Sequence, residues 1–207
     1  MPEPPEVTEI VDGSSLVRIR PMTEEQQKMS VQCLRGLGYQ GNNLLCSDWD
    51  ENHMEELDYN GIYEYLYEMK YEEKFSCEEA LGTIPREEFE GLMMEYLPVT
   101  AEQLQEYAAF NEEEGAYEWV RLGCFNYAPT FFGTSVPEVV DIKENEDGTV
   151  TLTVDAVCDM VLCDDAVITH ELTVRFGEDG SFQYLGNKIL YDGIKDIPDY
   201  QYRIREK

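Results

Sequence analysis

The chain has 207 residues, of which 44 are Asp or Glu and 15 are Lys or Arg, so its formal net charge at pH 7 is −29. A chain of this length can bury the core of one domain or of two small ones. Its excess of negative charge repels nucleic-acid phosphates and anionic lipids, which argues against nucleic-acid binding and against direct binding to a membrane surface. The charge favours cationic partners or divalent ions. The alternative is an acidic surface that is simply solvated and binds neither.

The first segment, residues 1–20, is rich in Pro and Glu and begins MPEPPEVTE. This composition is typical of an extended linker. No stretch of the chain approaches the apolar length of about 18 residues that a membrane-spanning helix needs. We interpret the segment as a spacer after a removed signal or lipid anchor, which predicts an extracellular, membrane-anchored protein. A disordered N-terminus of a cytosolic protein has the same composition.

Helices are predicted between residues 21 and 130. Two of them begin with a capping box, at Thr23 with Gln26 and at Thr100 with Gln103. Another lies within NHMEELDYNGIYEYLYEMKYEE. The clearest apolar face follows the proline of PREEFEGLMMEYL, where apolar residues recur at i, i+3, i+4, i+7 and i+8.

The pattern changes to strand-like alternation after about residue 130, with Asp-Gly turns in NEDGTV and GEDGSF. Four strands are predicted, at 138–145, 149–158, 166–176 and 181–190. We expect an α+β fold in which the helices of residues 21–130 pack on one face of a four-stranded antiparallel meander at 136–191. Residues 21–191 then form a single domain, and 192–207 form a C-terminal tail. Two separate domains are the alternative, although such a sheet with a bare face is poorly stable alone.

The six cysteines include no CxxC pair, which argues against a thioredoxin-like dithiol and a typical zinc ribbon. Cys158 and Cys163 flank a four-residue connection between two predicted strands, a separation that allows a disulfide. A disulfide there indicates an extracellular protein, whereas reduced, buried thiols are the alternative. A zinc site is disfavoured because His170 follows Cys163 by more than about 20 Å of extended strand.

His170 alternates with polar residues along its predicted strand and therefore shares the apolar face of Ile168, Leu172 and Val174. The simplest interpretation is a core histidine that is hydrogen-bonded to a neighbour. The alternative is a general base in a cavity between the sheet and the helices. The chain has no G-x-S-x-G, no HExxH and no Gly-rich phosphate loop, and no cofactor is expected.

Asp48, Asp50 and Asn52 match the first half of a calcium-binding loop. The sixth position of that loop is His53 where an EF-hand needs Gly, and the twelfth is Tyr59 where it needs Glu. This excludes an EF-hand and leaves a weak calcium candidate. An acidic approach to a helix is the alternative.

Tyr59, Tyr63, Tyr67 and Tyr71 repeat every four residues, and each step rotates about 40° around a helix. We expect the first two in the core and Tyr67 and Tyr71 partly exposed. Exposed tyrosines beside glutamates can form a contact patch for a protein or a glycan. Ordinary packing at the boundary of the core is the alternative.

The segment RLGCFNYAPTFFGTSVPEVVDIKENEDGTVTLTVDAVCDMV, followed by DDAVITHELTVRFGEDGSFQYLGN, resembles uncharacterised envelope-associated proteins of Gram-positive anaerobic bacteria. The resemblance extends over residues 99–187 and implies a secreted or lipoprotein-type setting, with no activity to transfer. The layout of helices followed by a curved sheet is similar, by analogy, to cystatin-like and nuclear-transport-factor-like folds.

Together these patterns predict a non-catalytic extracytoplasmic module of the cell envelope that binds a protein, a peptide or a glycan. One alternative is a small-ligand-binding or hydrolytic domain around His170. Another is a calcium-stabilised structural domain.

Overall fold

The computed structural model describes residues 22–76, 81–122, 135–157, 168–191 and 200–204. Four helices lie in these segments: α1 (Glu24–Leu34), α2 (Tyr59–Tyr71), α3 (Arg86–Tyr96) and α4 (Ala101–Tyr107). The strands of the same segments are β1 (Trp49–Asp50), β2 (Leu81–Pro85), β3 (Phe110–Asn111), β4 (Ala116–Val120), β5 (Val136–Glu144), β6 (Val150–Val157), β7 (Thr169–Phe176) and β8 (Phe182–Ile189). They form two antiparallel sheets, so the predicted α+β class is confirmed.

The helix ends follow the predicted signals. Both capping boxes are formed, because the Thr23 and Thr100 hydroxyls accept from the backbone N–H of Gln26 and Gln103, whose side chains accept in return. Helix α3 buries the predicted apolar face against α2 and β8. Within the described segments, no helix is long and apolar enough to cross a bilayer.

The larger sheet has the order β1-β8-β7-β6-β5. Strands β5 to β8 are the four predicted strands, and Gly148 and Gly180 take positive φ angles of 81° and 86° in the two predicted Asp-Gly turns. The prediction of a four-stranded sheet was nevertheless wrong, because β1 pairs with β8 as a fifth strand. A two-residue strand has no periodicity to detect. Gly186 permits the pairing, since a Cβ there would lie 3.0 Å from the Trp49 carbonyl oxygen.

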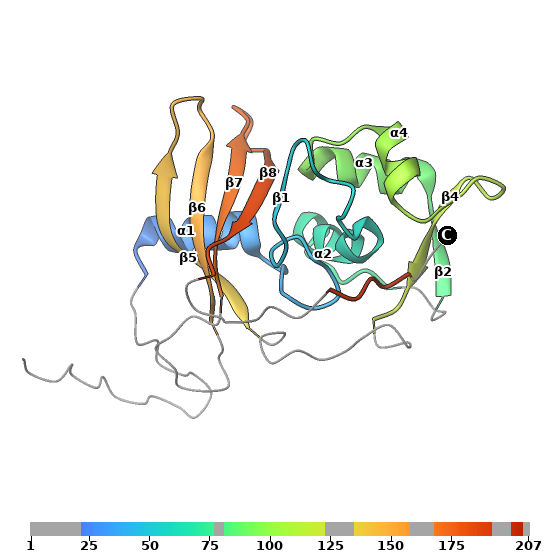
Figure 1. Ribbon diagram of the computed structural model, residues 1–207, viewed down its shortest axis with the longest axis horizontal. Helices are drawn as coiled ribbons and strands as arrows, with labels where there is room; N and C mark the ends of the chain where they lie inside the picture. Colours follow the sequence, from blue (N-terminus) through green and yellow to red (C-terminus); the bar gives the residue numbers. More distant parts are fainter. Residues whose placement is uncertain (1–21, 77–80, 123–134, 158–167, 192–199, 205–207) are drawn as a thin grey trace, which may run out of the picture.

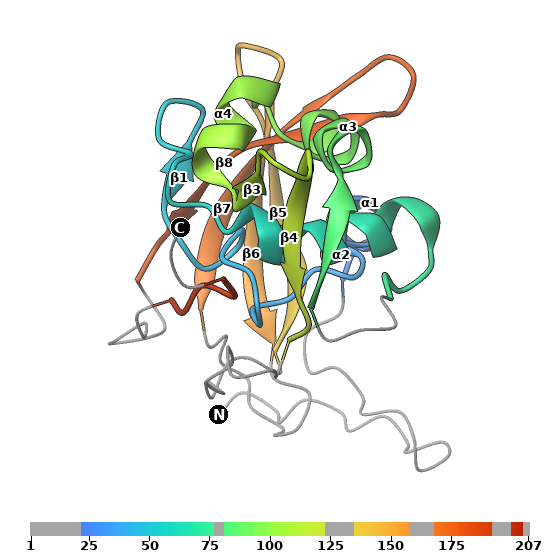
Figure 2. The same cartoon turned by 90° about the vertical axis from the view of Figure 1, so that its right-hand side faces the viewer.

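A second sheet, of order β2-β4-β3, lies in the region that was predicted to be helical. Each of its strands has five residues or fewer, which is too short for a clear alternation of apolar and polar residues. In Figures 1 and 2 this sheet and helices α2 to α4 lie on one side of the molecule, and the larger sheet lies on the other. Buried apolar residues of both sheets belong to one contiguous core.

Helix α1 packs along β5, an edge strand of the larger sheet (Figure 1). The pairing of β5 with β6 shifts by one residue after Val139, so Val140 is the extra residue of a bulge. Helix α1 supplies the hydrogen bonds that the ladder lacks there: Ser30 Oγ accepts from the Val139 N–H (3.0 Å), and Gln26 Nε2 donates to the Val140 carbonyl. The helix therefore satisfies the backbone of an otherwise exposed strand edge.

We expect Ser30→Ala to lower the free energy of unfolding by about 1–2 kcal/mol, because the buried N–H of Val139 then loses its acceptor. Urea denaturation measures this change. Lys28→Ala, an exposed position on the same helix, is the control and should change stability by less than about 0.5 kcal/mol. Equal effects of the two substitutions would contradict the role assigned to Ser30.

Candidate functional site

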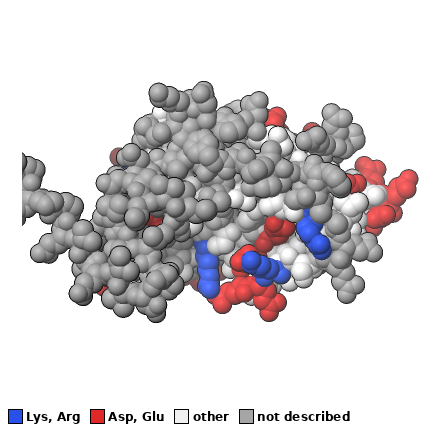
Figure 3. Space-filling view, turned by 90° about the horizontal axis from the view of Figure 1, so that it is seen from below, with Lys and Arg blue, Asp and Glu red and all other residues white. Residues whose placement is uncertain are grey.

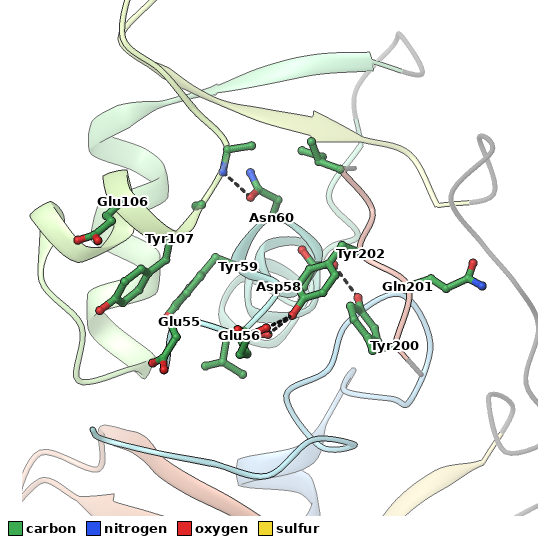
Figure 4. Close-up of a pocket in the computed structure, with 14 residues that line it drawn as sticks. Glu55, Glu56, Asp58, Tyr59, Asn60, Glu106, Tyr107, Tyr200, Gln201 and Tyr202 are labelled. Atoms are coloured by element: carbon green, nitrogen blue, oxygen red, sulfur yellow. Dashed lines mark hydrogen bonds between the residues drawn. The ribbon is translucent and has the colours of Figure 1, made fainter. Parts of the chain in front are cut away.

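A surface pocket with a volume of about 790 Å³ is lined by described residues. It lies between the loop that leads into α2, the end of α4 and the C-terminal segment 200–204 (Figure 4). Four tyrosines line it: Tyr59, Tyr107, Tyr200 and Tyr202. Four carboxylates line it as well: Glu55, Glu56, Asp58 and Glu106. We call it the tyrosine–carboxylate pocket.

Asp58 forms the floor of this pocket and also begins helix α2. Its Oδ1 accepts from the Gly61 N–H (2.8 Å), and its own N–H donates to Asn43 Oδ1 (2.8 Å). Position 61 has to be Gly, since a Cβ there would lie 2.4 Å from the Gly41 carbonyl oxygen. This close packing fixes both the Asp58 carboxyl and the following Tyr59 relative to the core.

The C-terminal segment forms the wall opposite α4. The Tyr200 hydroxyl donates to Asp58 Oδ2 (2.6 Å), and the Tyr202 hydroxyl donates to the carbonyl oxygen of Glu56 (2.7 Å) and to its Oε2 (3.1 Å). Figure 4 shows both tyrosines beside the loop that carries Glu56 and Asp58. Part of the predicted C-terminal tail is therefore docked against the domain.

Arg203 anchors this wall, and its side chain is only 1% exposed. Its Nη2 donates to Glu64 Oε1 (2.6 Å) and its Nε donates to the Gly41 carbonyl oxygen (2.8 Å). The guanidinium lies 5.7 Å from the centre of the Tyr65 ring, within the range of a cation–π contact. A buried guanidinium that is paired in this way holds the segment in one register.

The wall on the α4 side is held by the start of α2. The Tyr59 and Tyr107 rings stack with centres 6.3 Å apart, and the Tyr59 hydroxyl donates to the Met54 carbonyl oxygen (2.9 Å). Asn60 joins this wall to the smaller sheet, because it donates to the Glu118 carbonyl oxygen (2.7 Å) and accepts from the Ala109 N–H (2.9 Å). These contacts join this wall of the pocket to α2 and to the smaller sheet.

The pocket has a negative character, since no Lys, Arg or His is among its described lining residues. Glu55, Glu56 and Glu106 are exposed at its rim. Asp58 is buried, and burial raises the pKa of its carboxyl, while the hydrogen bonds from Tyr200, Gly61 and Arg203 oppose that rise. The site therefore offers tyrosine rings and carboxylate oxygens to whatever enters it.

The two other pockets differ in character. One lies on the outer face of the larger sheet and mixes Asp48, Asp50 and Glu51 with Arg175 and Lys188. Arg175 approaches Glu51 at 3.8 Å, so the basic side chains offset part of the negative charge there. The other is a mainly apolar groove between α1 and β5.

His170 lies in the core, with 0% exposure, and lines none of these three pockets. The side-chain amide of Asn187 donates to the carbonyl oxygens of Leu45 (3.1 Å) and Ser47 (2.9 Å), so its Oδ1 accepts from His170 Nδ1 (2.6 Å). His170 Nε2 consequently accepts from the Tyr39 hydroxyl (2.8 Å). Both ring nitrogens are used, and burial lowers the pKa of His170 to about 4.

The calcium candidates do not converge. Asp48 Oδ1 accepts from the Ile189 N–H (2.7 Å) at the sheet edge, whereas Asp50 Oδ1 accepts from the Asn52 N–H (2.8 Å) and contacts His53 Nδ1 (2.9 Å). Over the described ranges, no group of three or more His, Cys, Asp or Glu side chains is arranged to hold a metal ion. The structure gives the calcium hypothesis no geometric support.

The tyrosine series of α2 follows the predicted gradient of burial. Tyr59 and Tyr63 are at most 1% exposed, Tyr67 is partly buried and Tyr71 is 48% exposed. The Tyr67 and Tyr71 rings contact each other at 4.6 Å, and Tyr67 also packs on Phe75 (5.3 Å). These tyrosines lie at the end of α2 away from the pocket, so they form a separate surface.

The predicted disulfide between Cys158 and Cys163 lies outside the described residues. The described cysteines, Cys33 and Cys46, carry free thiols. Burial raises the pKa of both thiols to about 12, which keeps them protonated and poorly reactive at neutral pH.

The sequence interpretation missed the tyrosine–carboxylate pocket. Its residues come from segments 55–60, 106–109 and 200–204, which are far apart in the chain. A signal did exist in the predicted tail: the run Tyr200–Arg203 places two tyrosines beside an arginine in a chain with few cations. Such residues are candidates for docking rather than for a solvated tail.

The fold and the pocket define an α+β protein with two antiparallel sheets and an open, acidic site lined by aromatic rings. The chain belongs to a family of unknown function (DUF6070), whose sequence model matches residues 1–203. No curated protein and no solved structure matches the chain significantly.

The buried His170 predicts a pH-dependent stability. Its folded-state pKa of about 4 lies below the ordinary value of 6.5, so its contribution is complete above pH 6.5 and is lost as the pH falls toward 4. Between about pH 7 and about pH 4.5 the loss should be about 2 kcal/mol. His170→Gln removes the titrating group, so the stability difference between the natural protein and this variant should shrink over that range. Denaturation at both pH values measures it, and a constant difference would contradict the prediction.

Proposed function

We propose that this protein is a non-catalytic binding module and that the tyrosine–carboxylate pocket is its ligand site. The observation that carries the proposal is the pocket itself, which joins four tyrosines and four carboxylates from three distant segments. Its volume of about 790 Å³ falls in the usual range of ligand sites. Tyrosine supplies large, rigid contact area with a polar end, a combination that is enriched in binding surfaces.

Two features support binding rather than catalysis. His170, the candidate general base, has both ring nitrogens hydrogen-bonded inside the core and has no access to the pocket. The hydrogen bonds of the pocket residues hold the chain in place. Asp58 accepts from the Gly61 N–H, and the Tyr202 hydroxyl donates to the Glu56 carbonyl oxygen. Proteins, peptides and glycans remain the proposed partner classes, while the carboxylates disfavour nucleic acid.

We place this module outside the cytoplasm, in the cell envelope of a bacterium. The support for this location is the Pro/Glu-rich segment 1–20, which suits a spacer, and the spacing of Cys158 and Cys163, which suits a disulfide. The location is independent of the pocket, and each proposal can fail without the other.

A panel of probes tests the ligand site. We expect at least one of an arginine-containing peptide, an uncharged peptide and a neutral oligosaccharide to shift backbone amide NMR signals around the pocket. Tyr107→Leu should weaken the binding of that probe about tenfold, because it removes an aromatic wall. Tyr71→Leu is the matched control at an exposed tyrosine away from the pocket, and it should leave affinity unchanged.

If only Tyr71→Leu loses binding, the ligand site is the surface of Tyr67 and Tyr71 at the end of α2 instead of the pocket. Signal shifts that remain scattered over the surface for every probe would contradict the pocket as a ligand site.

Intact mass tests the proposed location. If Cys158 and Cys163 form a disulfide, alkylation of the denatured, unreduced protein should modify at most four of the six cysteines, and reduction should expose the remaining ones. The protein has to be isolated from its native compartment for this measurement. Modification of all six cysteines without reduction would contradict the disulfide and remove the main support for an external location.

A further inference from the structure

We infer that Arg203, which does not line the tyrosine–carboxylate pocket, is the positioning residue on which the affinity of that pocket depends. This inference rests on the proposed function and names the residue that controls the same site. Three observations support it: the direction in which Arg203 points, the number of wall contacts that it makes, and the shape of the slot that receives it.

Arg203 lies behind the C-terminal wall of the pocket. The described part of that wall is residues 200–204, and four of these five residues line the pocket: Tyr200, Gln201, Tyr202 and Ile204. Arg203 differs from them, because its side chain is directed into the protein and is only 1% exposed. An effect of Arg203 on a ligand therefore has to act through its neighbours in the wall.

The contacts that attach this wall are concentrated at Arg203. Three nitrogens of its guanidinium donate, Nε to the Gly41 carbonyl oxygen (2.8 Å), Nη2 to Glu64 Oε1 (2.6 Å) and Nη1 to the Val120 carbonyl oxygen (3.5 Å). The backbone N–H of Arg203 donates to Asp58 Oδ2 (3.2 Å). The two wall tyrosines contribute one hydroxyl donor each. Loss of the guanidinium therefore removes more wall contacts than loss of either hydroxyl.

The slot around Arg203 is shaped for a guanidinium. A Cβ at Gly41 would lie 2.8 Å from Arg203 Nη2, and Gly41 has a φ of 65°, which favours glycine. The guanidinium also lies over the Tyr65 ring, 5.7 Å from its centre. Lysine carries the same charge on a single nitrogen, so it cannot reach all three acceptors of the slot together. Arg203→Lys therefore changes the shape of the head group while it keeps the charge.

A wall that is attached in this way links docking of the chain end to ligand binding. A ligand that contacts Tyr200 or Tyr202 binds the docked form in preference, so its apparent affinity falls in proportion to the docked fraction. The buried and paired guanidinium favours the docked form, since undocking would leave its buried partners without their donors. Arg203→Lys lowers the docked fraction, and a bound ligand favours docking in return.

The test compares the natural full-length chain with full-length Arg203→Lys. Hydrogen exchange followed by mass spectrometry reports docking through the amides of residues 200–204, and we expect faster exchange there in the variant but unchanged exchange in β6 and β7. Calorimetric titrations use the arginine-containing peptide, the uncharged peptide and the neutral oligosaccharide. The probe that binds the natural protein should bind Arg203→Lys about tenfold more weakly.

A second variant disturbs the slot from its other side. The Cβ added in Gly41→Ala would meet Leu122 Cδ1 at 2.7 Å as well as the Arg203 guanidinium. Gly41 is not among the described lining residues, so the pocket surface keeps its side chains. Gly41→Ala should reproduce both effects of Arg203→Lys, and thermal unfolding verifies that both variants fold.

Ser30→Ala is the control for a loss of stability alone. It weakens the packing of α1 on β5, and Ser30 does not line the pocket. At a temperature at which every variant is folded, Ser30→Ala should change the affinity of the probe less than about twofold.

A reciprocal measurement separates positioning from general support of the fold. Saturation of Arg203→Lys with the binding probe should slow the exchange of residues 200–204, because binding and docking favour each other. A residue that only stabilised the fold would give no probe-dependent protection confined to this segment and the pocket.

Three results would overturn the inference. One is unchanged affinity in Arg203→Lys, since the position of the wall would then not matter for binding. Another is unchanged exchange of residues 200–204 in that variant, since Arg203 would then not hold the wall. The third is an equal loss of affinity in Ser30→Ala, which would assign the effect to stability. In each case the proposed function stands if Tyr107→Leu weakens the probe. If no probe responds to Tyr107→Leu, the proposed function fails, and the inference fails with it.

Discussion

The buried carboxyl of Asp58 is the group on which the arrangement around the pocket depends. It accepts hydrogen bonds from Gly61, Tyr200 and the backbone of Arg203, while its own N–H binds Asn43. A buried carboxyl without such donors would cost several kcal/mol. The hydrogen bonds to the Asp58 carboxyl therefore require one arrangement of the start of α2, the loop before it and the C-terminal segment. That arrangement creates the pocket.

A second constraint is the shortage of cations. Several described basic side chains are paired locally, as Arg35 is with Glu72 (2.7 Å) and Lys70 with Glu95 (2.5 Å). On the face of the molecule shown in Figure 3, the visible Lys and Arg side chains also lie beside Asp and Glu side chains. Arg203 is used to dock the chain end. Among the described residues, no Lys, Arg or His lines the pocket, and Arg203 is buried behind its wall.

Local signals predicted the parts of the fold that depend on neighbouring residues: the capping boxes at Thr23 and Thr100, the Asp-Gly turns, and the inward face of His170. The rest depends on contacts between distant segments. Strand β1 forms because it can pair with the edge of β8 at Gly186. The pocket forms because the Tyr200 hydroxyl binds Asp58, which is 142 residues away in the chain. Neither contact leaves a periodic pattern in the sequence, so neither could be predicted from it.

The protein has two polar networks, one that stabilises the core and one that lines the pocket. Tyr39, His170 and Asn187 satisfy one another inside the core and hold the loop before β1 against β8, so they offer nothing to a ligand. The pocket network, in contrast, lines an open surface site with tyrosine rings and carboxylates. It includes Tyr202, whose position depends on the docked C-terminal segment. A ligand that contacts Tyr202 would bind the docked form in preference to an undocked one, so ligand binding and docking of the chain end would be thermodynamically linked.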